Sequence, residues 1–296
     1  MFQKIKKLLI SRLASLSRTQ KLYRFDRIWR FLLNPDKNSP YHIDDVLFIG
    51  KNFWYINTRS YLEWTLFFYG AYEEQVQQLF KQYLMPGDIA LDVGSNIGIH
   101  TLYMANLVGP AGVVISFEPH KDIYTRQINN LTLNQATNVN AMQIGLSNKN
   151  ASAFLKQFDY ANSSNQGTSA IVAEYTENTL KIQVARLDDL ITSILPNPTS
   201  RINLIKIDIE GHEEAFFEGA MHTIKKHLPV IIFENSQDFL TNQNSTLKQN
   251  LSNHRYTFFG IDFSSLHPID LQKTNKIPYY RILALPNIDF KKESTS

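Results

Sequence analysis

A short glycine-containing loop between an apolar strand and a helix is the feature that most constrains how this chain folds. The stretch reads Asp88-Ile-Ala-Leu-Asp92-Val-Gly94-Ser-Asn96-Ile-Gly98. Glycines allow a tight turn and the close approach of a ligand, and a helix that starts directly after the turn offers free backbone N–H groups. In open α/β sheets, ligands bind where the strands end at such turns. The loop therefore predicts the first turn of a Rossmann-like unit with a nucleoside-type ligand.

Apolar strand-like runs alternate with helical patterns through the middle of the chain. The expected strands are residues 89–93, 113–117, 139–144, 204–207 and 230–233. The expected helices are residues 99–107, 124–133 and 213–226. Continuous apolar strands between helices indicate a sheet that is buried on both faces. We therefore predict an α/β fold with a mostly parallel, doubly wound sheet, closed by antiparallel edge-strand structure near residues 256–259 and 280–285.

The chain is long enough, at 296 residues, for one large α/β core. We expect a basic amphipathic segment at residues 1–40, one domain at 41–290 and a frayed tail at 291–296. Within the domain, a cofactor half is expected at about 85–150 and an acceptor-facing half at about 180–290. This division follows the order of the strands, because the glycine loop follows the first of them.

Two segments flank the expected core strands. Residues 46–49 and 53–56 are β-type runs around a Gly-Lys-Asn turn and predict a hairpin. Residues 71–84 predict a helix, which ends before Pro86. Between residues 147 and 180 the regular pattern fails, so we expect a mobile loop or lid there.

The positive charge of the chain is concentrated at its start. Residues 1–30 hold nine Lys or Arg and one Asp, so this segment carries +8 while the whole chain carries +3. Its apolar residues recur at helical spacing, which suits either a peripheral membrane helix or a helix that packs on the domain or on a second subunit. No nucleic-acid-binding module accompanies the charges, so we expect no nucleic-acid partner. The oligomeric state is left open.

Composition favours a cytoplasmic protein, with peripheral contact at the inner face of a membrane as an option through residues 1–30. The chain has no cysteine, which excludes disulfides and thiolate metal sites. No apolar run approaches the roughly 20 residues that span a bilayer.

A second acid narrows the choice of ligand. Glu118 ends the second expected strand, where a carboxylate can accept hydrogen bonds from both hydroxyls of a ribose. An NAD site would have Gly-x-Gly-x-x-Gly, but Asn96 stands at the second glycine. Asp92 would repel a pyrophosphate, yet it suits the positive amino end and sulfonium of S-adenosylmethionine. The pair of acids therefore favours S-adenosylmethionine as the cofactor, with an NAD-dependent oxidoreductase or a non-catalytic domain with a membrane- or partner-binding helix as alternatives.

Several motifs in order resemble the FkbM-type methyltransferase family. They are the glycine loop together with Tyr72-Glu73, Pro86-Gly87-Asp88, Phe117-Glu118-Pro119 and Lys206-Ile-Asp208-Ile-Glu210-Gly211-His212-Glu213. The resemblance covers about residues 65–240. It implies a class I methyltransferase fold, S-adenosylmethionine as the methyl donor, and an oxygen of a sugar, polyketide or other secondary metabolite as the acceptor. Ser95 and His100 depart from the family pattern, which more often has alanine and an aromatic residue there.

Most of the predicted cofactor-binding residues lie at the ends of the first two strands, while Glu73 precedes the first strand and Ser147 follows the third. The full set is Glu73, Asp92, Gly94, Asn96, Gly98, Glu118 and Ser147. The function that we predict is O-methylation of a hydroxyl on a saccharide, glycan or secondary metabolite. Its partner is then a small-molecule or glycan acceptor.

The predicted catalytic residues follow the fourth strand, because its carboxyl end faces the ligand crevice. Asp208 and Glu210 are favoured over His212 as the base that removes the hydroxyl proton, since a histidine after Gly211 can simply cap a helix. Lys206 either orients these groups or forms a surface salt bridge with Glu234.

Asp208, Glu210 and Glu234 also offer the oxygen ligands that Mg²⁺ or Ca²⁺ prefers. A metal would acidify a sugar hydroxyl, but no metal-specific spacing accompanies these residues. We therefore predict no metal, and a divalent cation is the less favoured alternative.

Overall fold

The computed structural model describes residues 12, 14–15, 43–156, 171–172, 175–197, 199–235, 251, 256–262, 265–271 and 277–287. The predicted basic segment at 1–40 lies outside these residues except at three positions, and the predicted tail at 291–296 lies outside them entirely. Ala14, one of the three, is fully buried. It belongs to the same hydrophobic cluster as Ile49, Trp54 and Ile56 of the hairpin, which favours packing of that position on the domain.

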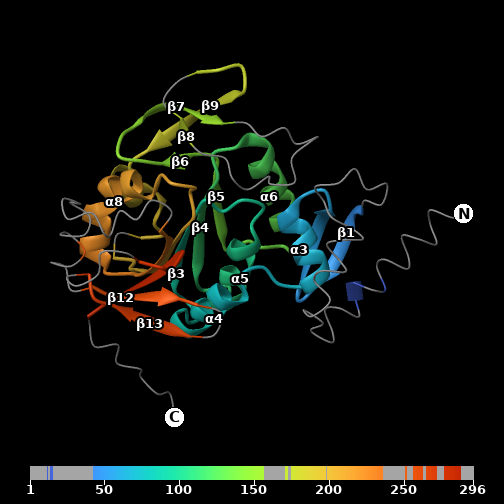
Figure 1. Ribbon diagram of the computed structural model, residues 1–296, viewed down its shortest axis with the longest axis horizontal. Coiled ribbons are helices and arrows are strands. Elements are labelled where there is room, and N and C mark those ends of the chain that lie inside the picture. The colour runs from blue at the N-terminus through green and yellow to red at the C-terminus, as the bar shows by residue number, and fades with distance from the viewer. Residues whose placement is uncertain are drawn as a thin grey trace, which may run out of the picture.

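A mixed sheet of eight strands forms the centre of the molecule (Figure 1). Its strands are β3 (Ile89–Val93), β4 (Val113–Phe117), β5 (Val139–Met142), β10 (Ile202–Ile207), β11 (Val230–Glu234), β12 (Tyr256–Ile261), β13 (Leu266–Ile269) and β14 (Arg281–Pro286). They lie in the order β13-β12-β14-β11-β10-β3-β4-β5. The five strands from β11 to β5 are parallel, while β14 is antiparallel to β11. The predicted mostly parallel sheet is confirmed.

Helices cover both faces of this sheet. The helices of the described residues are α3 (Tyr61–Tyr69), α4 (Glu74–Tyr83), α5 (Ile99–Val108), α6 (Lys121–Leu133), α7 (Leu187–Ile194) and α8 (Glu213–His227), of which α3 packs with the hairpin. One face packs its apolar side chains against α7 and α8, and the other packs against α4 and α5. Since successive side chains of a strand point to opposite faces, the continuous apolar strands fill both layers, and the doubly wound arrangement is confirmed.

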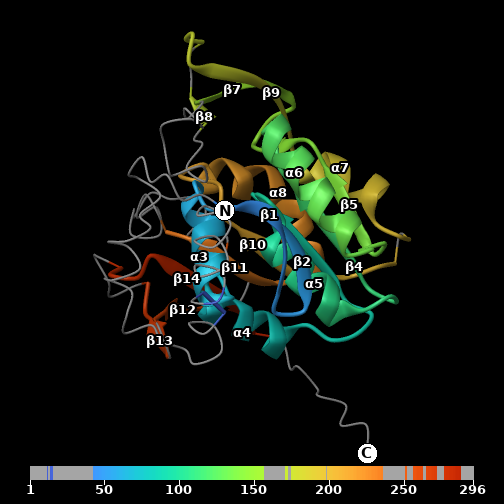
Figure 2. The same cartoon turned by 90° about the vertical axis from the view of Figure 1, so that its right-hand side faces the viewer.

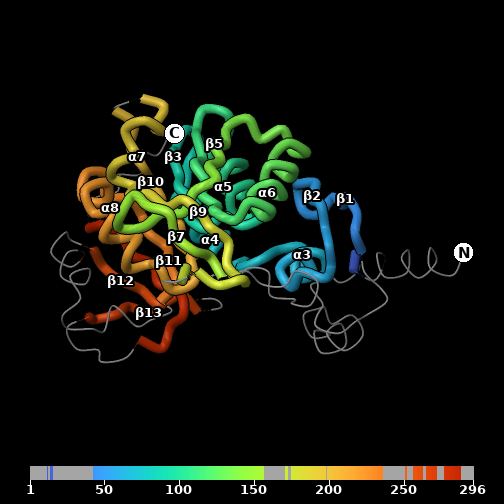
Figure 3. The backbone as a smooth tube through the Cα atoms, turned by 90° about the horizontal axis from the view of Figure 1, so that it is seen from above, coloured from blue at the N-terminus to red at the C-terminus, as the bar shows by residue number. Residues whose placement is uncertain are grey.

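The predicted hairpin is present as β1 (Asp44–Ile49) and β2 (Asn52–Asn57). With α3 it lies at one end of the molecule, opposite β12 and β13 (Figures 1 and 3). Its inward side chains join those of α3 in a hydrophobic cluster. Helix α3 was not predicted, because its sequence YLEWTLFFY is apolar on nearly every side and lacks an amphipathic period. The predicted helix at 71–84 is shorter and is α4.

The expectation of an irregular loop at residues 147–180 is wrong in part. Strands β6 (Gly145–Leu146), β7 (Ala151–Lys156), β8 (Ile171–Val172) and β9 (Thr179–Ala185) form a second, four-stranded sheet. Leu155, Ile182 and Val184 pack together as its small core. Apolar and polar residues alternate along these strands, and this pattern indicates a β-strand. The strands are too short for the pattern to have been recognised. The predicted lid sequence at 162–169 lies outside the described residues.

The predicted antiparallel edge of the sheet is confirmed by β12, β13 and β14, but the order of the strands within it differs from expectation. The segment expected at 280–285 is β14, which lies inside the sheet between β11 and β12, and the edge is the unpredicted strand β13. No helix within the described ranges is both long enough and apolar enough to cross a membrane.

Candidate functional site

The glycine loop joins β3 to α5 at the carboxyl end of the sheet. Gly94 has a φ of 75°, and a Cβ atom there would lie 1.8 Å from the carbonyl oxygen of Asp208. Gly98 has a φ of 89°, and Asn96 has a φ of 49°, in a region that asparagine adopts more readily than most residues. The loop backbone therefore passes too close to the end of β10 to carry a side chain at position 94.

Asp92, in β3, lies beneath this loop and is fully buried. One carboxylate oxygen accepts a hydrogen bond of 2.6 Å from the Thr101 hydroxyl, and the other lies 3.5 Å from Nζ of Lys206. Lys206 also donates to the carbonyl oxygen of Gly94 at 3.2 Å. Asp92 thus supports the loop from below and is not among the residues that line the adjoining cavity.

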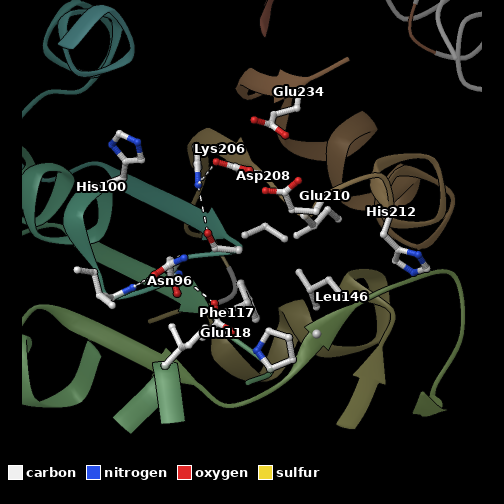
Figure 4. A pocket seen from close by; sticks show the side chains of 18 of the residues that line it. Asn96, His100, Phe117, Glu118, Leu146, Lys206, Asp208, Glu210, His212 and Glu234 are labelled. Carbon is white, nitrogen blue, oxygen red and sulfur yellow. Dashed lines mark hydrogen bonds and ion pairs between the residues drawn. The ribbon is translucent and has the colours of Figure 1, made fainter. Parts of the chain in front are cut away.

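A cavity of about 250 Å³ opens where β3, β4, β10 and β11 end (Figure 4). Predicted site residues that line it are Gly94, Asn96, Glu118, Lys206, Asp208, Glu210 and His212. Polar lining residues outside that prediction are Tyr61, Tyr72, Ser95, His100, Glu234, Tyr280 and Arg281. Apolar lining includes Phe117, Ile123, Leu146, Leu155 and Ile171. The cavity therefore joins a polar wall to an apolar one.

Glu118 lies on the wall beside the glycine loop. It follows β4 directly and is 7% exposed. Its two carboxylate oxygens accept hydrogen bonds from the backbone N–H groups of Asn96, at 3.0 Å, and His120, at 2.9 Å. Burial raises the pKa of Glu118 to about 7, against these hydrogen bonds. Each oxygen keeps a further lone pair for a ligand hydroxyl.

Three carboxylates gather on the opposite wall, at the ends of β10 and β11 (Figure 4). Asp208, Glu210 and Glu234 each place one oxygen within 4.8 Å of the others, so the predicted convergence is present. Burial and the neighbouring Asp208 carboxylate raise the pKa of Glu210 to about 7 and that of Glu234 to about 9. Like charges at this separation oppose one another, so the cluster favours a proton or a cation.

Lys206 is the cation between the two walls. It is 5% exposed, and its Nζ lies 3.5 Å from Asp92 Oδ1 and 3.4 Å from Asp208 Oδ2. Burial alone would lower the pKa of Lys206, but the carboxylates of Asp208, Asp92 and Glu234 outweigh it and the pKa is raised. The alternative of a surface salt bridge with Glu234 is wrong, since the ammonium is buried and paired with the two aspartates.

A chain of charged contacts that sequence reasoning missed runs along the third side of the cavity. Arg281, at the start of β14, donates to carboxylate oxygens of Glu73 and of Glu234. The other oxygen of Glu73 lies 2.9 Å from Nε2 of His100, and Tyr280 donates to Glu234 at 2.9 Å. Glu73 itself does not line the cavity. Its predicted contact with a cofactor would therefore have to act through His100 or Arg281.

His100 is neutral near pH 7, because burial lowers its pKa to about 4. With the hydrogen on Nε2 directed at Glu73, Nδ1 is left as an acceptor. Nδ1 of His100 and Oγ of Ser95 are buried, and neither has a hydrogen-bond partner within the described part of the chain. Both residues line the cavity. These are the two positions at which the sequence departs from the family pattern.

His212 and Ser147 lie apart from the carboxylates. His212 is at the start of α8, and its Nε2 is 2.8 Å from the Ser147 hydroxyl. Burial lowers the pKa of His212. Ser147 is 3% exposed and does not line the cavity, and neither does Gly98 of the loop. The structure thus brings Lys206, Asp208 and Glu210 together (Figure 4), but leaves His212 beside Ser147.

A comparison with known protein families shows to which family this chain belongs. The model of the methyltransferase FkbM domain matches residues 92–258, which is more than half of the chain and includes β4, β10 and β11. The chain belongs to the FkbM methyltransferase family. The predicted family is therefore confirmed, and so is the class I methyltransferase fold with its antiparallel strand next to β11.

Curated relatives of this FkbM-family chain match about half of it. Methyltransferase 1 of Beauveria bassiana is 30% identical over 148 residues, which cover 44% of this chain and 57% of the relative. Hexuronic acid methyltransferase AglP of Haloferax volcanii is 29% identical over 161 residues, which cover 54% of this chain and 61% of the relative. The chain thus spans about three fifths of the length of these relatives.

Solved methyltransferase structures also align with this FkbM-family chain. Methyltransferase FkbM from Methylobacillus flagellatus aligns with a TM-score of 0.40 and 16% identity, over 70% of this chain and 50% of that chain. A putative methyltransferase from Streptococcus mutans, in complex with SAH, aligns with a TM-score of 0.40 and 12% identity, over 71% of this chain and 95% of that chain.

Proposed function

We propose that this chain transfers the methyl group of S-adenosylmethionine to a hydroxyl oxygen of a saccharide, glycan or related metabolite. Membership of the FkbM family supports methyl transfer. The observation that carries the proposal is the arrangement of one cavity, with Glu118 and the glycine loop on one wall and Asp208, Glu210 and Glu234 on the facing wall. One wall suits an adenosyl group, and the other suits a hydroxyl that must lose its proton.

The residues present fit the methyl donor. Without a Cβ atom at Gly94, the loop backbone stays close to the end of β10, and Glu118 keeps lone pairs for ribose hydroxyls. Ser95 Oγ and His100 Nδ1 are buried polar atoms without partners among the described residues, and such atoms cost free energy unless a ligand pairs with them. When bound, the cofactor supplies a methyl group on a positively charged sulfur.

The lining charges argue against a dinucleotide. Four carboxyl groups line the cavity, Glu118 beside the glycine loop and Asp208, Glu210 and Glu234 on the facing wall, together with the cations Lys206 and Arg281. Glu234 holds a proton near pH 7, because its pKa is raised to about 9. A pyrophosphate at the loop would lie beside the Glu118 carboxylate and opposite that of Asp208, whereas the sulfonium and amino group of the methyl donor are attracted to these groups.

Asp208 and Glu210 are placed to accept the proton of the attacking hydroxyl. Both follow β10 at the cavity, and Lys206 holds Asp208 from behind at 3.4 Å. Positioning of the two reactants in one cavity contributes the larger part of the rate, and a positioned base adds about 10²–10⁴-fold. The role of Lys206 is then to fix the Asp208 carboxylate and to offset its charge when the cavity is closed to water.

A sugar-like acceptor is the substrate class that we propose. AglP, a relative of part of this chain, is named a hexuronic acid methyltransferase. In this chain, the facing wall presents carboxylate, phenol and guanidinium groups that hydrogen-bond to several hydroxyls at once. Its acidic balance favours a neutral acceptor over an anionic one.

Calorimetric titration tests the choice of cofactor. S-adenosylhomocysteine should bind to the purified chain, and NAD should not. Glu118→Ala should weaken S-adenosylhomocysteine about tenfold or more, because a buried hydrogen-bonded carboxylate contributes at least ~1.5 kcal/mol. The control is Glu177→Ala, because Glu177 is exposed and lies in the turn before β9. Binding of NAD instead would support an oxidoreductase, and binding of neither would support a non-catalytic domain.

Transfer of a labelled methyl group to a panel of neutral sugars and hexuronates tests which residue removes the hydroxyl proton. Asp208→Asn or Glu210→Gln should lower kcat about 100-fold or more while S-adenosylhomocysteine still binds. His212→Gln should lower kcat less than about tenfold, because His212 is paired with Ser147. Dialysis against EDTA should leave the rate unchanged. Loss of activity that Mg²⁺ restores would instead assign Asp208, Glu210 and Glu234 as metal ligands.

A further inference from the structure

The β1–β2 hairpin has apolar side chains on both faces. Trp54 and Ile56 point inward and are buried. The outer face carries Val46, Phe48, Phe53 and Tyr55, which are 38%, 59%, 47% and 38% exposed. A hairpin with one face on a core normally has polar side chains on the other, and contiguous exposed apolar groups mark interaction sites. The outer face therefore has the character of an interaction surface.

The four side chains form one continuous patch. Val46 is paired across the strands with Tyr55, and Phe48 with Phe53, and the centres of the two phenyl rings are 5.0 Å apart. The strands that carry the patch lie at one end of the described part of the molecule, and β1 and β2 face the viewer in Figure 2. The geometry points to a lipid surface as the partner of this patch, with the two phenylalanines entering the boundary between headgroups and acyl chains.

Strand pairing with a second chain is blocked along β2. Asn134 of α6 exchanges two hydrogen bonds with the backbone of Phe53, at 2.8 and 2.7 Å. Asn130 accepts from the N–H of Tyr55 at 3.0 Å, and Arg126 donates to its carbonyl oxygen. Since these backbone groups are already used, a partner contacts the side-chain face of the hairpin and does not extend it by adding a strand to β2.

The area of the patch is too small for a stable dimer. An aromatic side chain presents roughly 150–250 Å², so three that are about half exposed, with one valine, offer roughly 300–400 Å². A stable protein interface needs roughly 800 Å² from each partner. A lipid surface needs less, because a small apolar insertion acts together with electrostatic attraction.

The charge that attracts an anionic lipid surface lies in the segment before the hairpin. Within the hairpin, Lys51 lies at the turn between Phe48 and Phe53, whereas Asp44 and Asp45 lie at the start of β1, directly before Val46. The segment of residues 1–30, which carries +8, precedes the described domain, which begins at Ile43, directly before β1. Basic segments add attraction to anionic lipids. The patch and the basic segment thus supply the two signals that stable peripheral binding requires.

The cavity lies close to this surface along the chain. Tyr61 and Leu62, in the first turn of α3, line the cavity, and α3 begins four residues after β2 ends. Helix α3 thus connects the hairpin to the wall of the cavity. The inference does not depend on methyl transfer, because it concerns binding alone.

Sedimentation of the full chain with phospholipid vesicles tests the inference. Vesicles of equal parts phosphatidylcholine and phosphatidylglycerol should bind it, and vesicles of phosphatidylcholine alone should bind it at least tenfold more weakly. The double variant Phe48→Thr/Phe53→Thr, which keeps β-branched residues in the strands, should lose at least tenfold in vesicle affinity. Its thermal midpoint should stay that of the parent. Met85→Thr is the matched control, since Met85 is 63% exposed but outside the hairpin.

Each other occupant of the patch gives a distinct result that overturns the inference. A second copy would appear as a dimer of the parent, without vesicles, that the double variant dissociates. Cover by the chain's own first 42 residues would leave vesicle binding unchanged and lower the thermal midpoint of the double variant. In a second measurement, brominated acyl chains should quench the tryptophan fluorescence that the Phe48→Trp variant adds to that of the parent. They should not quench the fluorescence that Met85→Trp adds, and equal quenching of the two variants would also contradict docking through the hairpin.

Discussion

At the scale of single residues, Gly94 is where backbone geometry and the site coincide. Its φ is 75°, and an added Cβ atom would lie 1.8 Å from the Asp208 carbonyl oxygen, which leaves no room for a side chain. Gly94→Ala should therefore lower the free energy of unfolding by about 3 kcal/mol or more, as the sum of backbone strain and overpacking. Urea unfolding followed by circular dichroism measures the loss.

Gly87→Ala separates the cost of backbone strain from that of overpacking. Gly87 also has a positive φ, of 93°, but nothing lies within 4 Å of the added atom. This variant should lose only the conformational cost of about 1–2 kcal/mol. Equal losses in the two variants would show that contact with the end of β10 contributes nothing.

At the scale of elements, Arg281 links β14 to the start of α4 and to the end of β11. It is separated from Glu73 by 208 positions in the chain, and Glu73 is 7% exposed. Arg281→Met leaves the buried Glu73 carboxylate without its cation, so we expect a loss of about 3 kcal/mol in unfolding free energy. The measurement is again urea unfolding.

A double-mutant cycle isolates this contact. Arg281→Met/Glu73→Gln should recover about 1 kcal/mol or more relative to Arg281→Met, because the uncompensated charge is gone. If the double variant shows the summed losses of the two single variants, the contact between β14 and α4 carries no coupling energy.

At the scale of the whole molecule, buried carboxyl groups set a pH dependence of stability. Burial raises the pKa of Glu63 and that of Glu118 to about 7, from an ordinary 4.5. Between these values the folded chain binds more protons than the unfolded chain, so the unfolding free energy falls as pH rises. Each group contributes at most about 3 kcal/mol. The lowered pKa of His100 acts in the opposite direction below about pH 6.5. The Glu63 contribution is therefore read from the difference in unfolding free energy between the parent and Glu63→Gln, which should fall between about pH 5 and pH 7.5 in urea unfolding. A slope unchanged by Glu63→Gln would contradict the assignment.

Much of the fold follows from local patterns. Apolar runs, such as those that end before Asp92 and Glu118, indicate strands. Helical patterns lie between successive runs, which indicates that the strands are parallel. The second sheet and α3 were missed for opposite reasons. The strands of the sheet are short with a small core of their own, whereas α3 is apolar on nearly every side and so lacks a helical period.

The candidate site was also predictable in part. Asp92, Gly94, Glu118, Lys206, Asp208 and Glu210 stand in local motifs at strand ends, so the sequence alone predicts that they share one edge of the sheet. Family and fold were predictable for that reason. Tertiary structure alone decided that Arg281 reaches both Glu73 and Glu234, that His100 joins this chain of contacts, and that His212 turns to Ser147. These contacts join residues far apart in the chain, and no local spacing encodes which distant side chains the folded strands bring within hydrogen-bonding distance.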